Sequence, residues 1–166
     1  MKNACRSMLL GVALLSSLAS AKPLPAALNS VLLLKLLAFE ASVSQQQAVH
    51  ILVVNDDALA DALTKKIGSP IGAGKLAAVY RNRAPDNTKL HAIYINGERE
   101  PASLSTYAQS QHAVTVGNNL KQAHHGVALI LYDDEGLPGI SISMSPSKSL
   151  GLSWDPKVLE VSTLIY

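Results

Sequence analysis

The sequence predicts an α/β protein in which a mostly parallel sheet is flanked by helices on both faces. Short apolar runs of strand length, such as Val49 to Val54, are continuous rather than alternating, which is typical of parallel strands covered on both sides. Segments with helical spacing separate these runs in the order that a βαβ unit requires. Near the end of the chain an acidic turn between two apolar runs indicates an antiparallel hairpin at the edge of the sheet.

Residues 1–21 have the features of a cleaved signal peptide. Lys2 and Arg6 make a short basic segment, Met8 to Leu18 is apolar, and Ala19-Ser20-Ala21 has the small-x-small pattern of a processing site. We expect cleavage after Ala21, export to the periplasm and a single domain over residues 22–166. An uncleaved membrane anchor is the alternative, but the apolar run is shorter than the ~18 residues that a spanning helix needs.

The composition excludes several classes of function once the leader is removed. The chain has 14 basic and 12 acidic residues, and loss of Lys2 and Arg6 leaves 12 of each. A formally neutral chain gives no reason to expect a nucleic-acid partner. Cys5 is the only cysteine and leaves with the leader, so the mature chain has no disulfide, no thiol nucleophile and no cysteine metal ligand.

The first element expected in the mature chain is a helix over Leu24 to Phe39, which is dense in leucine and carries Lys35 near its centre. Apolar side chains around most of a helix indicate burial on more than one side. A second membrane helix is the alternative, but the segment is short for a span and has a charge near its middle. A polar link is expected over Glu40 to Gln47.

The body of the sheet follows from apolar runs that alternate with helical segments. Asn55-Asp56-Asp57 can cap a helix directly after the first strand, and Pro101 is suited to opening a later one. This order predicts a flavodoxin-like three-layer sandwich. The expected strands are Val49 to Val54, Leu76 to Tyr80, Leu90 to Ile95 and His112 to Val116, and the expected helices are Ala58 to Ile67 and Pro101 to Ser110.

The C-terminal part is expected to contain a hairpin and a final helix. Strands over Val127 to Tyr132 and Gly139 to Met144 flank the acidic turn, which Gly136 closes. A helical turn then reaches Gly151. Asp155-Pro156 has the residue types of a helix start and opens a last amphipathic helix.

Several stretches, taken in order, carry a resemblance to a known family. They are the leader, the leucine-rich helix, VHILVV followed by Asn55-Asp56, AVTVGNN, the strand Ile140 to Met144 and the Gly151-Leu152 step. The helix positions that continue this order are Asp155, Val158, Leu159, Val161 and Ser162. Together they resemble the YfiR family of small periplasmic regulators, over nearly the whole mature chain.

The resemblance implies a non-enzymatic role, in which the protein holds back the sensor region of an inner-membrane diguanylate cyclase and lowers cyclic di-GMP output. Two departures qualify it. Family members often carry cysteines that pair in the periplasm, and this mature chain has none. Ser143 stands where the family commonly has asparagine, so the local backbone bond of that asparagine is in doubt.

The residues themselves give no catalytic, metal or cofactor site. The adjacent pair His124-His125 cannot share one face of a helix or strand, so it lacks metal-ligand spacing. Asp133-Asp134-Glu135 lacks the ligand spacing of an EF-hand and reads as a solvated turn. The glycines of Ile71 to Lys75 precede a strand, whereas a phosphate loop follows one. No GxSxG motif exposes a serine.

One group of polar residues is a candidate ligand site, because ligands of open parallel sheets bind beyond the carboxyl ends of the strands. Asparagine and aspartate also favour caps and turns for local reasons, so a purely structural role stays open. The residues expected at this edge are Asn55, Asp56, Asn96, Glu98, Asn118 and Asn119.

A protein partner requires an exposed apolar surface, which the first or last helix can supply. Leu152, Trp154 and Leu159 are the candidates, although a lone tryptophan is more often part of a core. The alternative function is a periplasmic small-ligand-binding module that serves another membrane receptor or transporter. The sequence leaves open whether the chain forms a homodimer.

Overall fold

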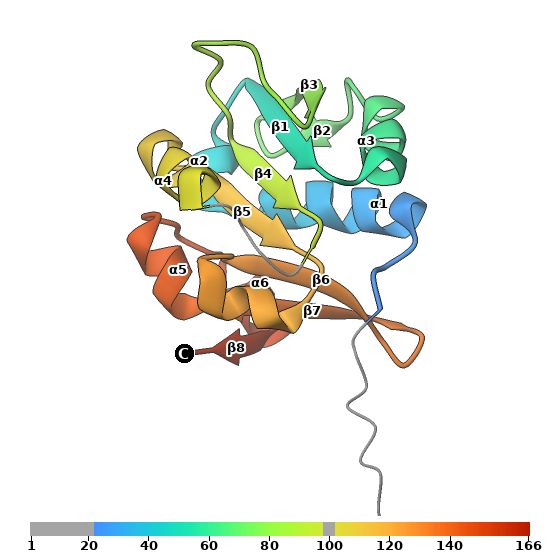
Figure 1. Ribbon diagram of the computed structural model, residues 1–166, viewed down its shortest axis with the longest axis vertical. Coiled ribbons are helices and arrows are strands. Elements are labelled where there is room, and N and C mark those ends of the chain that lie inside the picture. The colour runs from blue at the N-terminus through green and yellow to red at the C-terminus, as the bar shows by residue number, and fades with distance from the viewer. Residues whose placement is uncertain (1–21, 98–101) are drawn as a thin grey trace, which may run out of the picture.

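The computed structural model describes residues 22–97 and 102–166, and within them the chain forms a mixed α/β fold around one eight-stranded sheet (Figure 1). The expected signal peptide and Glu98 lie outside the described residues. The helices are α1 Ala26–Leu37, α2 Ala41–Ser44, α3 Asp57–Thr64, α4 Ala102–Gln111, the 3₁₀ helix η1 Leu120–His125, α5 Met144–Ser149 and α6 Pro156–Glu160. The strands are β1 Ala48–Val54, β2 Pro70–Ile71, β3 Gly74–Arg81, β4 Ala92–Ile95, β5 Val114–Gly117, β6 Leu129–Asp134, β7 Leu137–Ser143 and β8 Thr163–Ile165.

The sheet is mostly parallel, as the continuous apolar runs predict. Its strand order is β2-β3-β1-β4-β5-β6-β7-β8, and only the β2–β3 and β6–β7 pairs are antiparallel. The chain runs from β1 outward to β3 and then returns to β4 on the other side of β1. The direction of chain progression therefore reverses between β1 and β4, whose carboxyl ends meet at one edge of the sheet.

Helices cover both faces of the sheet. In Figure 1, α1 and α3 lie on one side, and α4 and α5 lie on the other. Alternate side chains of β1 illustrate the division, because Ile51 packs into the core beneath α1 and α3 while Leu52 packs beneath α4. Leucines such as Leu33 and Leu37 fill the first core, so the leucine-rich first helix is a buried core helix.

The acidic turn of the β6–β7 hairpin has the geometry that its residues favour. Glu135 and Gly136 both have left-handed backbone angles, with φ of 53° and 91°, and the Asp133 carboxylate accepts a hydrogen bond from the Gly136 amide at 2.6 Å. The turn residues are exposed, which agrees with a solvated hairpin.

Two of the sequence-based expectations are wrong. The polar link over Glu40 to Gln47 contains the helix α2, and Glu40 itself is fully buried. The last helix begins at Asp155-Pro156 as expected but ends at Glu160. The final residues then form β8, which pairs in parallel with β7 and makes the outer edge of the sheet. This strand is only three residues long, which is too short for hydrophobic periodicity to separate helix from strand.

Candidate functional site

The carboxyl edge of the central strands brings three of the expected site residues together. Asn55, Asn96 and Asn118 follow β1, β4 and β5 in turn. The Asn96 amide nitrogen donates to the Asn55 carbonyl at 2.9 Å, and the Asn118 amide nitrogen donates to Asn96 Oδ1 at 2.7 Å. The three asparagines therefore form one hydrogen-bonded row across the strand ends.

The row continues to the loop after β3 through a pair of left-handed residues. Asn55 and Asn82 have φ of 60° and 56°, a region that asparagine tolerates better than most residues. Asn82 Oδ1 accepts the Asn55 backbone N–H at 2.8 Å. This hydrogen bond joins the loop after β1 to the loop after β3, and the left-handed backbone at both positions favours asparagine.

A buried polar pair lies beneath this row. Asn29 of α1 donates through Nδ2 to the Tyr94 hydroxyl at 3.1 Å. Burial of Tyr94 raises the pKa of its hydroxyl, and the Asp56 carboxylate raises it further, so the phenol stays neutral. Asn29 Oδ1 is buried and has no hydrogen-bond partner among the described residues.

Gln122 of η1 holds the same edge together, although sequence reasoning did not select it. Its Oε1 accepts the backbone N–H groups of Asn118 and Asn119 at 2.8 and 2.9 Å. Its Nε2 donates to the carbonyls of Ile95 and Gly97 at 3.0 and 2.7 Å. A fully buried amide that uses both ends in this way fixes two loops at once.

Gly117 is required beside this glutamine. A Cβ at that position would lie 2.2 Å from Gln122 Oε1, so any larger residue would displace the side chain that binds the two loops. The signal available in the sequence was the spacing of Asn119 and Gln122, which form a capping box at the start of η1.

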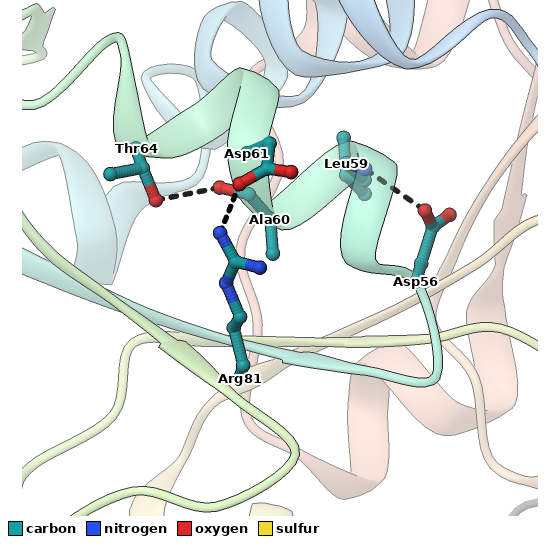
Figure 2. A network of polar contacts seen from close by, with 6 residues as sticks. All are labelled: Asp56, Leu59, Ala60, Asp61, Thr64 and Arg81. Atoms are coloured by element: carbon teal, nitrogen blue, oxygen red, sulfur yellow. Dashed lines mark hydrogen bonds and ion pairs between the residues drawn. The ribbon is translucent and has the colours of Figure 1, made fainter.

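Asp56 and Asn119 have local capping roles. Asp56 accepts the Leu59 backbone N–H at 2.9 Å at the start of α3, as Figure 2 shows. In the same view, Asp61 on α3 is ion-paired with Arg81 at the end of β3. Asn119 Oδ1 accepts from the Lys121 backbone N–H. Polar side chains at this edge are thus largely used by the fold itself.

The edge has little capacity for chemistry of its own. The asparagines are neutral amides that bond to one another, and among the described residues no group of three or more His, Cys, Asp or Glu could hold a metal ion. The exposed His124 and His125 lie in η1, away from this row. The arrangement therefore fixes loops. Among the buried side-chain atoms described at this edge, Asn29 Oδ1 has no hydrogen-bond partner.

A histidine cluster lies near the opposite end of the strands. The rings of His50 and His91 are 5.8 Å apart, and that of Tyr80 stands 6.0 Å from His50. His91 Nδ1 accepts the His50 backbone N–H at 3.0 Å, which requires a ring that is unprotonated at this nitrogen. Burial lowers the pKa of His91 below 6.5, and His50 and Lys89 lower it further.

This cluster predicts a loss of stability in acid. Well above pH 6.5 the His91 imidazole is neutral in both the folded and the unfolded chain. Below pH 6.5 the imidazole becomes protonated in the unfolded chain but stays neutral in the folded chain. The free energy of unfolding is thus expected to fall as pH drops from 6.5 towards the lowered folded pKa. Urea titrations at pH 7.5 and 5.5 should show a smaller fall for His91→Asn, whose Oδ1 can replace the Nδ1 acceptor. An equal fall in both proteins would exclude His91 as the cause.

The three candidate partner-binding residues are partly or wholly covered by the fold. Trp154 is buried, and its indole N–H donates to Ser147 Oγ at 3.1 Å. Leu152 and Leu159 are half-buried and pack against the core. Their contact with a partner stays a prediction, since each offers only part of its side chain.

The side chain of Phe39 presents more exposed apolar area than these three residues. It follows α1, is 43% exposed and stands between two hollows of about 330 and 350 Å³. Lys35 and Lys66 line the first hollow, and Trp154 lines the second. We call these four residues and the walls of the two hollows the Phe39 surface. Sequence reasoning missed it, because leucine density in α1 does not say which apolar side chain stays outside.

No helix in the described part of the chain is long and apolar enough to cross a membrane. Among proteins with curated functions, none is similar enough to the chain to match it. Residues 27–163 match the YfiR/HmsC-like family. The matched segment runs from α1 to the start of β8. The protein therefore belongs to the YfiR/HmsC-like family, whose members are periplasmic regulators.

Proposed function

We propose that this protein is a non-enzymatic periplasmic regulator that binds an inner-membrane diguanylate cyclase and lowers its cyclic di-GMP output. Family membership over residues 27–163 supports the proposal. The proposal includes export to the periplasm, with cleavage of the signal peptide after Ala21. The scaffold is proposed to be a flavodoxin-like sandwich, for which the order β3-β1-β4-β5-β6 of the parallel strands is the support.

The observation that carries the binding role is the Phe39 surface. A half-exposed phenylalanine between two hollows offers a partner a projecting aromatic ring and two recesses, which is the form of many binding hot spots. Ile67 adds an apolar side chain that is 50% exposed beside Lys66. Trp154 lines the second hollow, and we propose that Leu152 and Leu159, which lie close to it in the sequence, support the same contact.

Charge on the rim indicates what the partner presents. Lys35 and Lys66 border the first hollow, and neither forms an ion pair with a described residue. An apolar patch with basic neighbours complements an apolar segment flanked by acidic side chains. The periplasmic sensor region of the cyclase is expected to carry such a segment.

Phe39→Ser is expected to weaken binding to the sensor region by about tenfold or more, because it removes the aromatic ring at the centre of the contact. Isothermal calorimetry with the purified mature chain measures the affinity, and cyclic di-GMP levels in cells measure control of the cyclase. Leu137→Ser is the matched control, since Leu137 is 71% exposed on the β6–β7 hairpin. Equal affinity for the Phe39 variant and the wild type would reject the Phe39 surface.

The second candidate function is a small-ligand-binding module that serves another membrane receptor or transporter. The unpartnered Asn29 oxygen beneath the carboxyl edge favours it. The ligand contacts would come from Asn55, Asp56, Asn96, Glu98, Asn118 and Asn119. If alanine substitutions of these residues in pairs change neither control of the cyclase nor ligand-induced stabilisation, this edge has no binding role.

A further inference from the structure

The outer edge of the sheet is formed by β8, which has β7 on one side and no described neighbour on the other. The Ser143 amide donates to the Ala128 carbonyl, so the backbone groups of Ser143 point towards β6 and those of Ile142 point towards β8. In the parallel β7–β8 pair Ile142 lies opposite Leu164, and Ile142 then bonds to the residues on either side of Leu164. The N–H and C=O of Leu164 consequently point outward, away from the sheet.

The two edges of the sheet differ in how they are protected. At the opposite edge β2 has two residues, and one of them is Pro70, which has no N–H to offer. The residues of β8 include no proline and no charge. Val161 and Tyr166, which flank β8, are 70% and 89% exposed. An uncharged edge of this kind is a template for another extended strand.

A hollow of about 420 Å³ opens beside this edge. Ile165 and Tyr166 line it from the strand, and Ser145, Pro146 and Ser149 line it from α5. Side chains alternate along β8, so Leu164 packs towards the core beneath α1 while Ile165 faces the opposite side. A strand added outside β8 would place every second side chain on the Ile165 side, next to the hollow.

We propose that β8 accepts an extended segment of the partner as a ninth strand, hydrogen-bonded to Leu164, with one uncharged side chain seated in the hollow beside α5. In strand addition of this kind, hydrogen bonds between the two backbones supply affinity, and a recess for a side chain supplies specificity. The identity of the partner rests on the proposed function. The strand-accepting edge deepens that function by naming a contact separate from the Phe39 surface.

The geometry favours a partner segment over a second copy of this chain. A strand of three residues is a small contact for holding two domains together, since stable dimers bury about 1,200–2,000 Å² in total. A flexible segment can instead follow β8 and also enter the hollow. The lining of the recess includes His124 but no aspartate, glutamate, lysine or arginine, which matches an uncharged side chain.

Leu164→Pro tests the backbone contact directly, and Leu164→Ala is its matched control. Proline removes the one amide that points outward, whereas both variants lose the same packing of the leucine side chain. An outward N–H at a sheet edge is a position where proline is tolerated, so thermal unfolding of the two variants should agree. Binding of each purified mature variant to the purified periplasmic region of the cyclase is then measured by calorimetry.

A second pair of variants tests the hollow. Ser149 is exposed on α5 and lines the recess, so Ser149→Trp should fill it and weaken binding, while Ser149→Ala should not. This pair leaves β8 unchanged and decides the question if Leu164→Pro fails to fold.

The expected result is at least a tenfold loss of affinity for Leu164→Pro relative to Leu164→Ala, together with a loss for Ser149→Trp. If the wild type binds the sensor region and these variants bind equally well, the strand-accepting edge is rejected and the proposed function stands. The edge is equally rejected if Leu164→Pro changes only self-association of the chain. If the wild type does not bind the sensor region, the proposed function fails, and the edge proposal fails with it.

Discussion

Glu40→Ala is expected to lower the free energy of unfolding by about 3–4 kcal/mol, because it removes the acceptor of one buried and two part-buried hydrogen bonds. The Glu40 side chain is fully buried. One oxygen accepts the Val43 backbone N–H at 2.9 Å and the Ser42 hydroxyl, and the other accepts the Ser153 backbone N–H at 3.0 Å. Alanine would leave the buried Val43 N–H without a partner, would free the part-buried Ser153 N–H, and would leave a cavity beside α2.

Urea denaturation of the purified mature chain, followed by circular dichroism, measures this effect. Glu40→Gln is the informative comparison, since it keeps the volume and one acceptor oxygen. Its NH₂ group would face either the Val43 or the Ser153 N–H, so an intermediate loss is expected. A loss below about 1 kcal/mol for the alanine variant would show that water replaces the carboxylate.

Gln122→Ala is expected to lower the free energy of unfolding by about 3 kcal/mol, because four hydrogen bonds of one buried side chain are lost together. The loops after β4 and β5 would also separate, so the row of Asn55, Asn96 and Asn118 should lose order. Urea denaturation measures the first effect. Hydrogen exchange at the Asn118 amide measures the second.

Gln122→Glu separates the two halves of this clamp. The carboxylate keeps the acceptor for Asn118 and Asn119 but faces the Ile95 and Gly97 carbonyls without a proton to donate. The variant is expected to be less stable than the wild type at neutral pH and to approach it as the carboxyl group is protonated in acid. Equal stability at pH 7 would contradict a donating role for the Gln122 nitrogen.

Much of the fold could be predicted because its signals are local. The runs that became β1, β3, β4, β5 and β6 are short and mostly apolar, and that of β7 alternates apolar residues with serine. Asp56 and Asp155 begin helices through caps that involve only neighbouring residues. Burial of Glu40 depends on Ser153, 113 residues away, so no local pattern could indicate it. The pairing of β8 with β7 depends in the same way on tertiary contacts.

The sequence predicts where the polar residues of the candidate site lie, but it does not predict which hydrogen bonds their side chains form. Polar residues after β1, β4 and β5 were expected at one edge, and Asn55, Asn96 and Asn118 do lie in one row there. Their bonding to one another, and the role of Gln122 beneath them, depend on side-chain geometry that spacing does not fix. Exposure of Phe39 likewise depends on which way α1 turns against the sheet.

The position of α1 has a consequence for how the chain is made. This first helix buries Leu33 and Leu37 in a core that also contains Val158 and Trp154, near the end of the sequence. Since synthesis runs from the N-terminus, these leucines have no complete core until the last segments are available. The nascent chain should therefore remain an open substrate for holding chaperones, and a truncation before Ser153 should yield an aggregation-prone protein rather than a smaller folded one.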